Sequence, residues 1–153
     1  MDIGTIKAPD VLLCGYYGED NLGDDALLQV LLQELPEHVR PLITARHASA
    51  VRRFAPDASV VNRRSLRSVL ARIGDVRALV LGGGSLLQDS TSVRSLVYYV
   101  LLIVMARCRG RSVILWGQGL GPLKRPISRW MVRLVLPLCS GASWRDQRSF
   151  DTA

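Results

Sequence analysis

The chain has 153 residues, of which 48% are hydrophobic, and it carries a formal net charge of +7. This length and composition predict one globular domain with a sizeable core and exclude a disordered chain. Aromatic residues make up only 6% and are not interleaved with basic blocks, so the sequence gives little support to nucleic-acid binding. The positive charge, nearly all of it arginine, suits anionic small molecules or an anionic membrane surface, although a solvated basic surface would give the same total.

The cysteines and the apolar runs predict a cytoplasmic protein. Cys14, Cys108 and Cys139 are far apart, and each is set in apolar sequence, which is typical of reduced core cysteines and not of a disulfide framework or a metal site. The N-terminal segment MDIGTIKAPD lacks the basic and apolar regions of a signal peptide. The longest uncharged apolar run, residues 95–106, is about half of the ~20 residues that span a membrane, so it predicts a buried helix.

In chain order, predicted strands alternate with predicted helices. Short runs rich in Val, Ile and Leu predict strands at residues 11–14, 41–45, 59–61, 78–81, 112–116 and 142–145. Helices are predicted at residues 24–35, 48–54, 65–73, 92–107 and 127–138. The alternation predicts an α/β fold with a doubly wound, mostly parallel Rossmann-like sheet, in which ligands lie beyond the carboxyl ends of the strands. A helix start at residues 146–149 indicates either a frayed end or a chain that leads into a second domain.

Glycine-rich loops follow three of the predicted strands. They read GYYGEDNLGDD from Gly15, GGGSLLQDS from Gly82 and GQGLGP from Gly117, and none matches GxGxxG or a P-loop. Glycine lets backbone N–H groups approach a ligand closely, although tight strand-to-helix turns need glycine in any case. Because three such loops follow carboxyl ends of one sheet, we expect them to line one cleft.

The acids of the first loop fit a polyol better than a diphosphate, since the loop carries several carboxylates and no lysine. Asp24 occupies the expected position of a helix N-cap, and Asp25 opposes the helix dipole. If Asp24 instead faces the cleft, its carboxylate beside Asn21 can bind or deprotonate a sugar hydroxyl. The sequence leaves both roles open for Asp24.

The other candidates lie later in the chain, and two of them, Asp89 and Arg145, have two alternative roles. Asp89 is either a helix cap or a second carboxylate in the cleft, and Gln118 lies between two glycines, where a buried amide needs partners. Arg145 ends the last predicted strand and either clamps a phosphate or carboxylate or forms an ion pair with Asp146. Tyr98 and Tyr99 lie in the middle of a helix and are interpreted as packing residues.

Taken in order, GYYGEDNLGDDALL, LGGGSLLQDSTSVRSLVYY, GQGLGPL and WRDQRS resemble the polysaccharide pyruvyl transferase family, most closely the bacterial branch that pyruvylates cell-wall polysaccharide. The resemblance implies that residues 1–153 form the N-terminal Rossmann-like domain of a GT-B-like, two-domain enzyme whose C-terminal domain is missing from this chain. It also implies pyruvyl transfer from phosphoenolpyruvate to a sugar or lipid-linked saccharide, as a ketal, with no metal and no cofactor besides that donor.

The resemblance assigns roles to residues of the matching motifs. Asp24 and Arg145 would be catalytic, with the loop around Asp24 holding the acceptor or supplying the base, and Arg145 reaching the donor. None of the motifs supplies an acid for C3 of the enol. The implied location is the cytoplasm, with contact to the inner face of the membrane as an option. Substrate-binding roles would fall on Gly18, Asn21, Gly23, Gly83, Gly84, Ser85, Asp89, Gln118, Gly119, Asp146 and Ser149.

Two other functions fit the same pattern. A GT-B-like glycosyltransferase half domain would use the same sheet and glycine turns to bind a nucleotide sugar, although the acidic first loop disfavours a diphosphate. A non-catalytic fragment that binds saccharide or a partner domain would also account for the missing acid.

Overall fold

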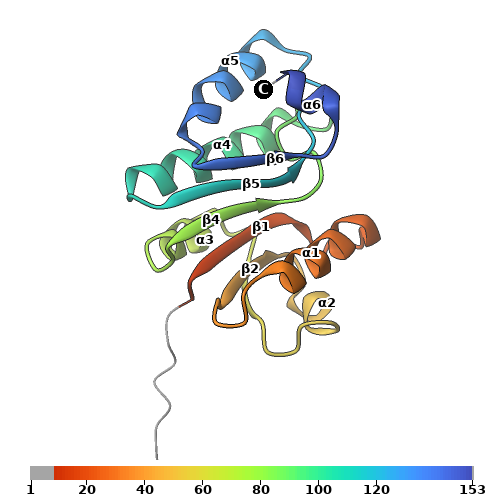
Figure 1. Ribbon diagram of the computed structural model, residues 1–153, viewed down its shortest axis with the longest axis vertical. Helices are drawn as coiled ribbons and strands as arrows, with labels where there is room; N and C mark the ends of the chain where they lie inside the picture. Colours follow the sequence, from red (N-terminus) through yellow and green to blue (C-terminus); the bar gives the residue numbers. More distant parts are fainter. Residues whose placement is uncertain (1–8, 153) are drawn as a thin grey trace, which may run out of the picture.

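A computed structural model describes residues 9–152 of the chain (Figure 1). The segment 1–8, within which the sequence predicts no signal peptide, lies outside the described residues. The predicted alternation of strands and helices is confirmed. The elements, in chain order, are β1 (Val11–Tyr17), α1 (Leu22–Glu34), β2 (Pro41–Ala45), α2 (Ala48–Arg52), β3 (Ser59–Asn62), α3 (Leu66–Ile73), β4 (Ala78–Gly82), α4 (Val93–Cys108), β5 (Ser112–Gln118), α5 (Pro126–Val135), the 3₁₀ turn η1 (Leu136–Leu138), β6 (Gly141–Trp144) and α6 (Gln147–Thr152).

The six strands form one parallel sheet in the order β3-β2-β1-β4-β5-β6, so the predicted doubly wound Rossmann-like fold is confirmed. Figure 1 shows β1 and β4 next to each other in the middle of the sheet. From β1 the chain proceeds outward through β2 and β3, and it then returns to the centre and proceeds outward the other way from β4. The two halves of the sheet therefore diverge at the carboxyl ends of β1 and β4, which is the switch point where such sheets bind ligands.

Alternate residues of the central strands pack on opposite faces of the sheet. Leu13 and Val80 share a buried cluster with Leu28 and Leu31 of α1 and Val51 of α2. Their neighbours point the other way, into a larger cluster that includes residues of α3, α4 and α5. Both faces of the sheet are thus covered by helices, which is why the strands contain continuous apolar runs. The members of the larger cluster include Leu12, Leu79, Leu81, Val69, Leu96, Leu102, Val113, Leu115 and Val132.

Several element ends differ from the prediction by one to three residues, and three of these differences have a clear local reason. Strand β1 continues to Tyr17 because this side chain is fully buried and its hydroxyl donates to the carbonyl of Gly82 at 2.6 Å. Helix α1 begins at Leu22 because Asn21 caps it, and α5 gives way to the 3₁₀ turn η1 because Pro137 has no N–H to donate. Over the described range, none of the helices combines the length and apolar character needed to cross a membrane.

Candidate functional site

A polar pocket of about 410 Å³ lies at the switch point, between the loop that follows β1 and the loop that follows β4. Strand β1 contributes Tyr16 and the loop after it Asn21. Helix α1 contributes Asp24, and α4 contributes Ser95 and Tyr99. Of the three glycine loops that were expected to line one cleft, the first two line this pocket, whereas the third, from Gly117, contributes no residue to it. The remaining lining residues come from the second loop and the start of α4, namely Ser85, Leu86, Gln88, Thr91 and Ser92.

Asn21, and not Asp24, is the N-cap of α1, so of the two roles that the sequence left open for Asp24 the capping one is wrong. The side-chain oxygen of Asn21 accepts from the backbone N–H of Gly23 at 3.1 Å, and its amide group donates to Asp24 Oδ2 at 2.6 Å. Asp24 lies in the first turn of the helix, where its carboxylate lines the pocket. Burial raises the pKa of Asp24 above its usual value, and the neighbouring carboxylate of Asp25 raises it further.

Asp25 holds the first loop in shape. Its Oδ1 accepts from the backbone N–H of Gly18 at 3.0 Å, across a turn in which Gly18 has a φ of 63°. That φ lies in the left-handed region, and an added Cβ would come within 2.9 Å of the carbonyl oxygen of His47. The N–H groups of Gly18 and Gly23 therefore bind side chains of their own loop, and neither glycine lines the pocket.

The second loop lies against Asp24. Gly83 and Gly84 both have positive φ values, 70° and 69°, and a Cβ on Gly84 would lie 2.8 Å from Asp24 Oδ1. Glycine is therefore required here to let the backbone approach the carboxylate. Ser85 follows directly and lines the pocket.

Gln118, the last residue of β5, connects this strand to the second glycine loop by hydrogen bonds. It is fully buried, its amide donates to the carbonyls of Leu81 at 3.0 Å and Gly83 at 2.9 Å, and its oxygen accepts from Leu86 N–H at 3.4 Å. The resemblance gave Gln118 a substrate-binding role, but Gln118 does not line this pocket, and its hydrogen bonds hold the glycine loop. Gly119 continues the tie, because its N–H donates to the carbonyl of Gly84 at 2.8 Å.

Asp89 lies outside the helices and binds the backbone at the N-terminus of α5. Its carboxylate oxygens accept from the backbone N–H groups of Lys124 at 2.8 Å and Arg125 at 2.9 Å, at the start of α5. These hydrogen bonds, that of Lys124 first, lower the pKa of Asp89 to about 2. The sequence left open a cap near the start of the long apolar helix or a carboxylate in the cleft. Ser92 is the N-cap of α4, Asp89 instead binds the backbone that leads into α5, and Asp89 does not line the pocket.

Replacing Asp89 with Asn should lower stability above about pH 4 and flatten the loss of stability in acid. Since the folded-state pKa lies below the ordinary value of 3.8, the stabilisation is complete above that value and disappears as the pH falls toward 2. Urea unfolding at a series of pH values measures this. The exposed Asp57 is the matched control, and an unchanged pH slope in Asp89→Asn would refute the capping role.

Arg145 follows β6, and its guanidinium lies near the second loop. An added Cβ on Gly119 would lie 2.9 Å from Arg145 Nη2 and would collide with Ser85 Oγ, so these three residues are in close proximity. The side chain of Arg145 is 56% exposed and forms an ion pair with Asp146 at 3.4 Å. Asp146 Oδ1 also accepts from Ser149 N–H and Oγ at 2.8 Å, while Ser149 Oγ accepts from Leu120 N–H. Asp146 and Ser149 thus fasten α6 to the loop after β5.

The sequence did not indicate Arg63, which contacts two residues of the pocket wall, Tyr16 and Tyr99. It follows β3, donates to Glu19 Oε1 at 2.6 Å and to the hydroxyl of Tyr99 at 3.2 Å, and stacks 4.5 Å from the ring centroid of Tyr16. The hydrogen bonds that Arg63 and Arg46 donate to Glu19 lower the pKa of this carboxyl, although its burial acts in the opposite direction. The one available signal was its position: like Arg145, Arg63 follows a strand at the carboxyl edge of the sheet. Tyr99, interpreted from sequence as packing, also lines the pocket.

The cysteines differ from the prediction in one case. Cys14 is buried and Cys139 half-buried, as core cysteines should be, but Cys108 at the end of α4 is exposed. Burial raises the pKa of the Cys14 thiol to about 12, so it is an inert part of the core. Among residues 9–152, no three His, Cys, Asp or Glu side chains are close enough together to hold a metal ion.

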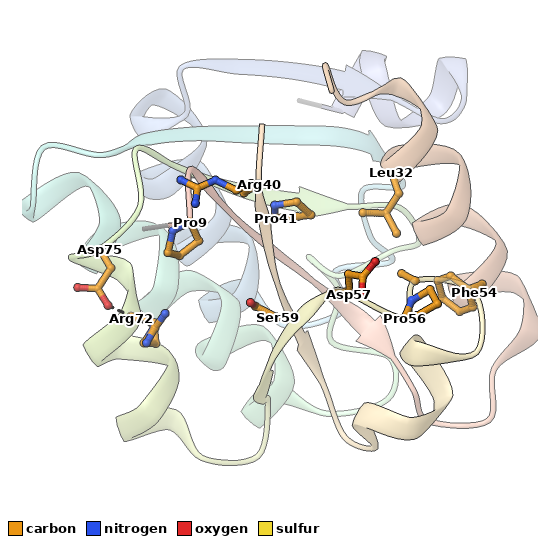
Figure 2. Close-up of a pocket in the computed structure, with 12 residues that line it drawn as sticks. Pro9, Leu32, Arg40, Pro41, Phe54, Pro56, Asp57, Ser59, Arg72 and Asp75 are labelled. Atoms are coloured by element: carbon orange, nitrogen blue, oxygen red, sulfur yellow. Dashed lines mark ion pairs between the residues drawn. The ribbon is translucent and has the colours of Figure 1, made fainter. Parts of the chain in front are cut away.

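A larger pocket, of about 670 Å³, lies at the opposite end of the strands (Figure 2). Pro9, Pro41 and Ser59, which line it, are at or just before the amino ends of β1, β2 and β3. Its polar rim includes Arg72 and Asp75, which form an ion pair with each other at 3.2 Å. Since Rossmann-like sheets bind ligands at their carboxyl ends, we assign the candidate site to the smaller pocket.

The sheet order and the pocket at its switch point define a Rossmann-like α/β domain with a pocket between two glycine-rich loops. The family model described as polysaccharide pyruvyl transferase matches residues 21–153. The chain belongs to the polysaccharide pyruvyl transferase family, a family of transferases. No curated protein and no solved structure was found to match it.

Proposed function

We propose that this protein transfers a pyruvyl group from phosphoenolpyruvate to two hydroxyls of a saccharide, forming a cyclic ketal. The observation that supports this most directly is a carboxylate with a raised pKa, that of Asp24, in a polar pocket at the switch point. A raised pKa makes a carboxylate a stronger base toward a hydroxyl. The side chains around it are rich in hydroxyls that suit a sugar, those of Ser85, Thr91, Ser92, Ser95 and Tyr99.

The reaction balances without water. C3 of the enol takes a proton, which leaves an electron-poor C2, and one saccharide hydroxyl forms a bond to that carbon. The C2–O bond to phosphate breaks, and the second hydroxyl closes the ring. The two hydroxyls lose two protons, of which one is matched by the new proton on C3 and the other leaves with phosphate. In this scheme Asp24 removes a hydroxyl proton.

The donor would lie on the side of the pocket nearer β5 and β6. Arg145 is exposed there, close to Gly119 and Ser85, and its guanidinium suits the phosphate or the carboxylate of phosphoenolpyruvate. Binding such an anion would compete with the ion pair to Asp146, which is solvent-exposed and therefore weak.

The proposal is tested by incubating the full chain with phosphoenolpyruvate and a methyl galactoside, which offers both vicinal and 4,6-diols. Phosphate release that depends on the saccharide, together with the mass of a pyruvyl ketal, would support it. Saccharide binding without phosphate release would favour the saccharide-binding alternative. Protection against thermal unfolding by a nucleoside diphosphate, with no response to phosphoenolpyruvate, would favour a glycosyltransferase-like function.

We further propose that Tyr99 donates a hydrogen bond to the saccharide. Its oxygen accepts from Arg63, and within residues 9–152 its proton has no acceptor, so that proton is available to the pocket. Burial raises the pKa of Tyr99 to about 12, so the hydroxyl remains a donor at neutral pH. Tyr99→Phe should weaken the binding of the methyl galactoside roughly tenfold, measured by ligand-observed NMR titration.

Tyr98 supplies the matched control for this substitution. Its hydroxyl is also buried, but it has no hydrogen-bond partner in the described part of the chain and does not line the pocket. Tyr98→Phe should therefore leave saccharide affinity unchanged. Equal affinities in wild type, Tyr99→Phe and Tyr98→Phe would refute the role of Tyr99. The proposed role of Asp24 as base would be unaffected by that result.

A further inference from the structure

Helix α5 exposes a row of large apolar side chains. Ile127, Trp130 and Leu134 are 53%, 59% and 52% exposed, and their spacing places them on one stripe of the helix. The opposite side of the same helix, with Val132 and Val135, is buried against the core. A tryptophan flanked by two large aliphatic residues on an exposed stripe is unusual for a surface that faces only water.

Basic side chains lie directly beside this stripe. Arg129 and Arg133 are exposed one turn apart, and Arg133 is also one turn from Trp130. With Lys124 and Arg148 they line a common surface hollow of about 320 Å³. The chain has no acidic residue between Asp89 and Asp146, so nothing in this stretch offsets their charge.

We propose that α5 is a membrane-docking surface, on which Ile127, Trp130 and Leu134 insert into an anionic phospholipid bilayer while Arg129 and Arg133 contact the lipid phosphates. Charge complementarity favours a bilayer over a protein partner, because every charged residue of α5 is basic. Apolar anchors beside arginines are the combination that places a helix in the plane of a membrane interface. Figure 1 shows α5 at the end of the molecule opposite α2. A helix at this end can contact a membrane surface without interference from α2.

The test is flotation of the full chain with vesicles of phosphatidylcholine alone and of phosphatidylcholine mixed with phosphatidylglycerol. We expect binding to the mixed vesicles only, at low ionic strength, and its loss at high ionic strength. Arg129→Gln with Arg133→Gln should reduce partitioning roughly 30-fold. Trp130→Ser should reduce it on the order of tenfold.

The matched control is Arg52→Gln with Arg53→Gln, an equal change of charge on exposed residues at the end of α2. This variant should bind vesicles as wild type does. An equal loss in the control pair would overturn the proposal, since it would show attraction by net charge alone. Binding that is equal on neutral vesicles, or absent on both, would overturn it as well. A stable dimer that buries Trp130, without vesicle binding, would assign the stripe to a protein interface instead.

Discussion

Replacing Asp24 with Asn should reduce ketal formation by about 100-fold or more, while the fold stays intact. The amide cannot take a proton from a saccharide hydroxyl, but it keeps the size of the side chain that Gly84 accommodates. The measurement is saccharide-dependent phosphate release with phosphoenolpyruvate as donor. In the wild type, activity should fall as the pH drops through the raised pKa of Asp24, because the base is then protonated.

The stability of the same variant should move in the opposite direction. A carboxyl whose pKa is raised on folding binds its proton more tightly in the folded state, so its ionised form costs stability once the pH exceeds the ordinary value of 3.8. Asp24→Asn removes that cost, and it should unfold at the same or a higher temperature at neutral pH.

The neighbouring Asp25 is the natural control for this experiment. Asp25→Asn should lower the free energy of unfolding by about 1 kcal/mol, because the hydrogen bond from Gly18 to a charged oxygen becomes one to an amide, and it should retain most of the turnover. Near-normal turnover in Asp24→Asn would refute its role as base.

Replacing Gln118 with Leu should have the largest effect on stability, with a loss of about 2–4 kcal/mol in the free energy of unfolding. The leucine leaves the carbonyls of Leu81 and Gly83 and the N–H of Leu86 without partners inside the protein. For a domain of this size, the loss corresponds to a drop of about 10 °C in Tm. Thermal and urea unfolding, followed by circular dichroism, measure both quantities.

The exposed Gln147 gives the comparison for Gln118. Its amide donates only to Asp151 on the surface of α6, so Gln147→Leu should change stability by less than about 0.5 kcal/mol. If Gln118→Leu were equally mild, the three hydrogen bonds of Gln118 would not be what holds the second glycine loop.

The strands and the layout of the site could be predicted because they follow from local patterns. Short apolar runs locate the strands, and glycine-rich loops that follow parallel strands must lie at the same edge of the sheet. The position of Asp24 near the start of α1 was predicted, but the residue that caps this helix was not. Asn21 and Asp24 are both suitable N-cap residues, and only the backbone conformation decides between them.

The rest of the site depends on partners that are distant in sequence. Arg63 reaches Glu19 across 44 residues and Tyr99 across 36, and no periodicity relates these positions. Gln118 was correctly expected to need partners, yet its carbonyl acceptors could not be named before the register of β4 and β5 was known. Tyr99 shows the same difficulty, because a tyrosine in an apolar helix suits a core and a pocket wall equally well.

The cap that Asp89 provides has a mechanical consequence. Only three residues separate it from Ser85 in the pocket wall, and its carboxylate holds the backbone at the start of α5. Residues 85–89 therefore connect the pocket wall directly to the N-terminus of the exposed helix α5. Since the pKa of Asp89 is about 2, its carboxylate is ionised and keeps these hydrogen bonds over the whole physiological range of pH.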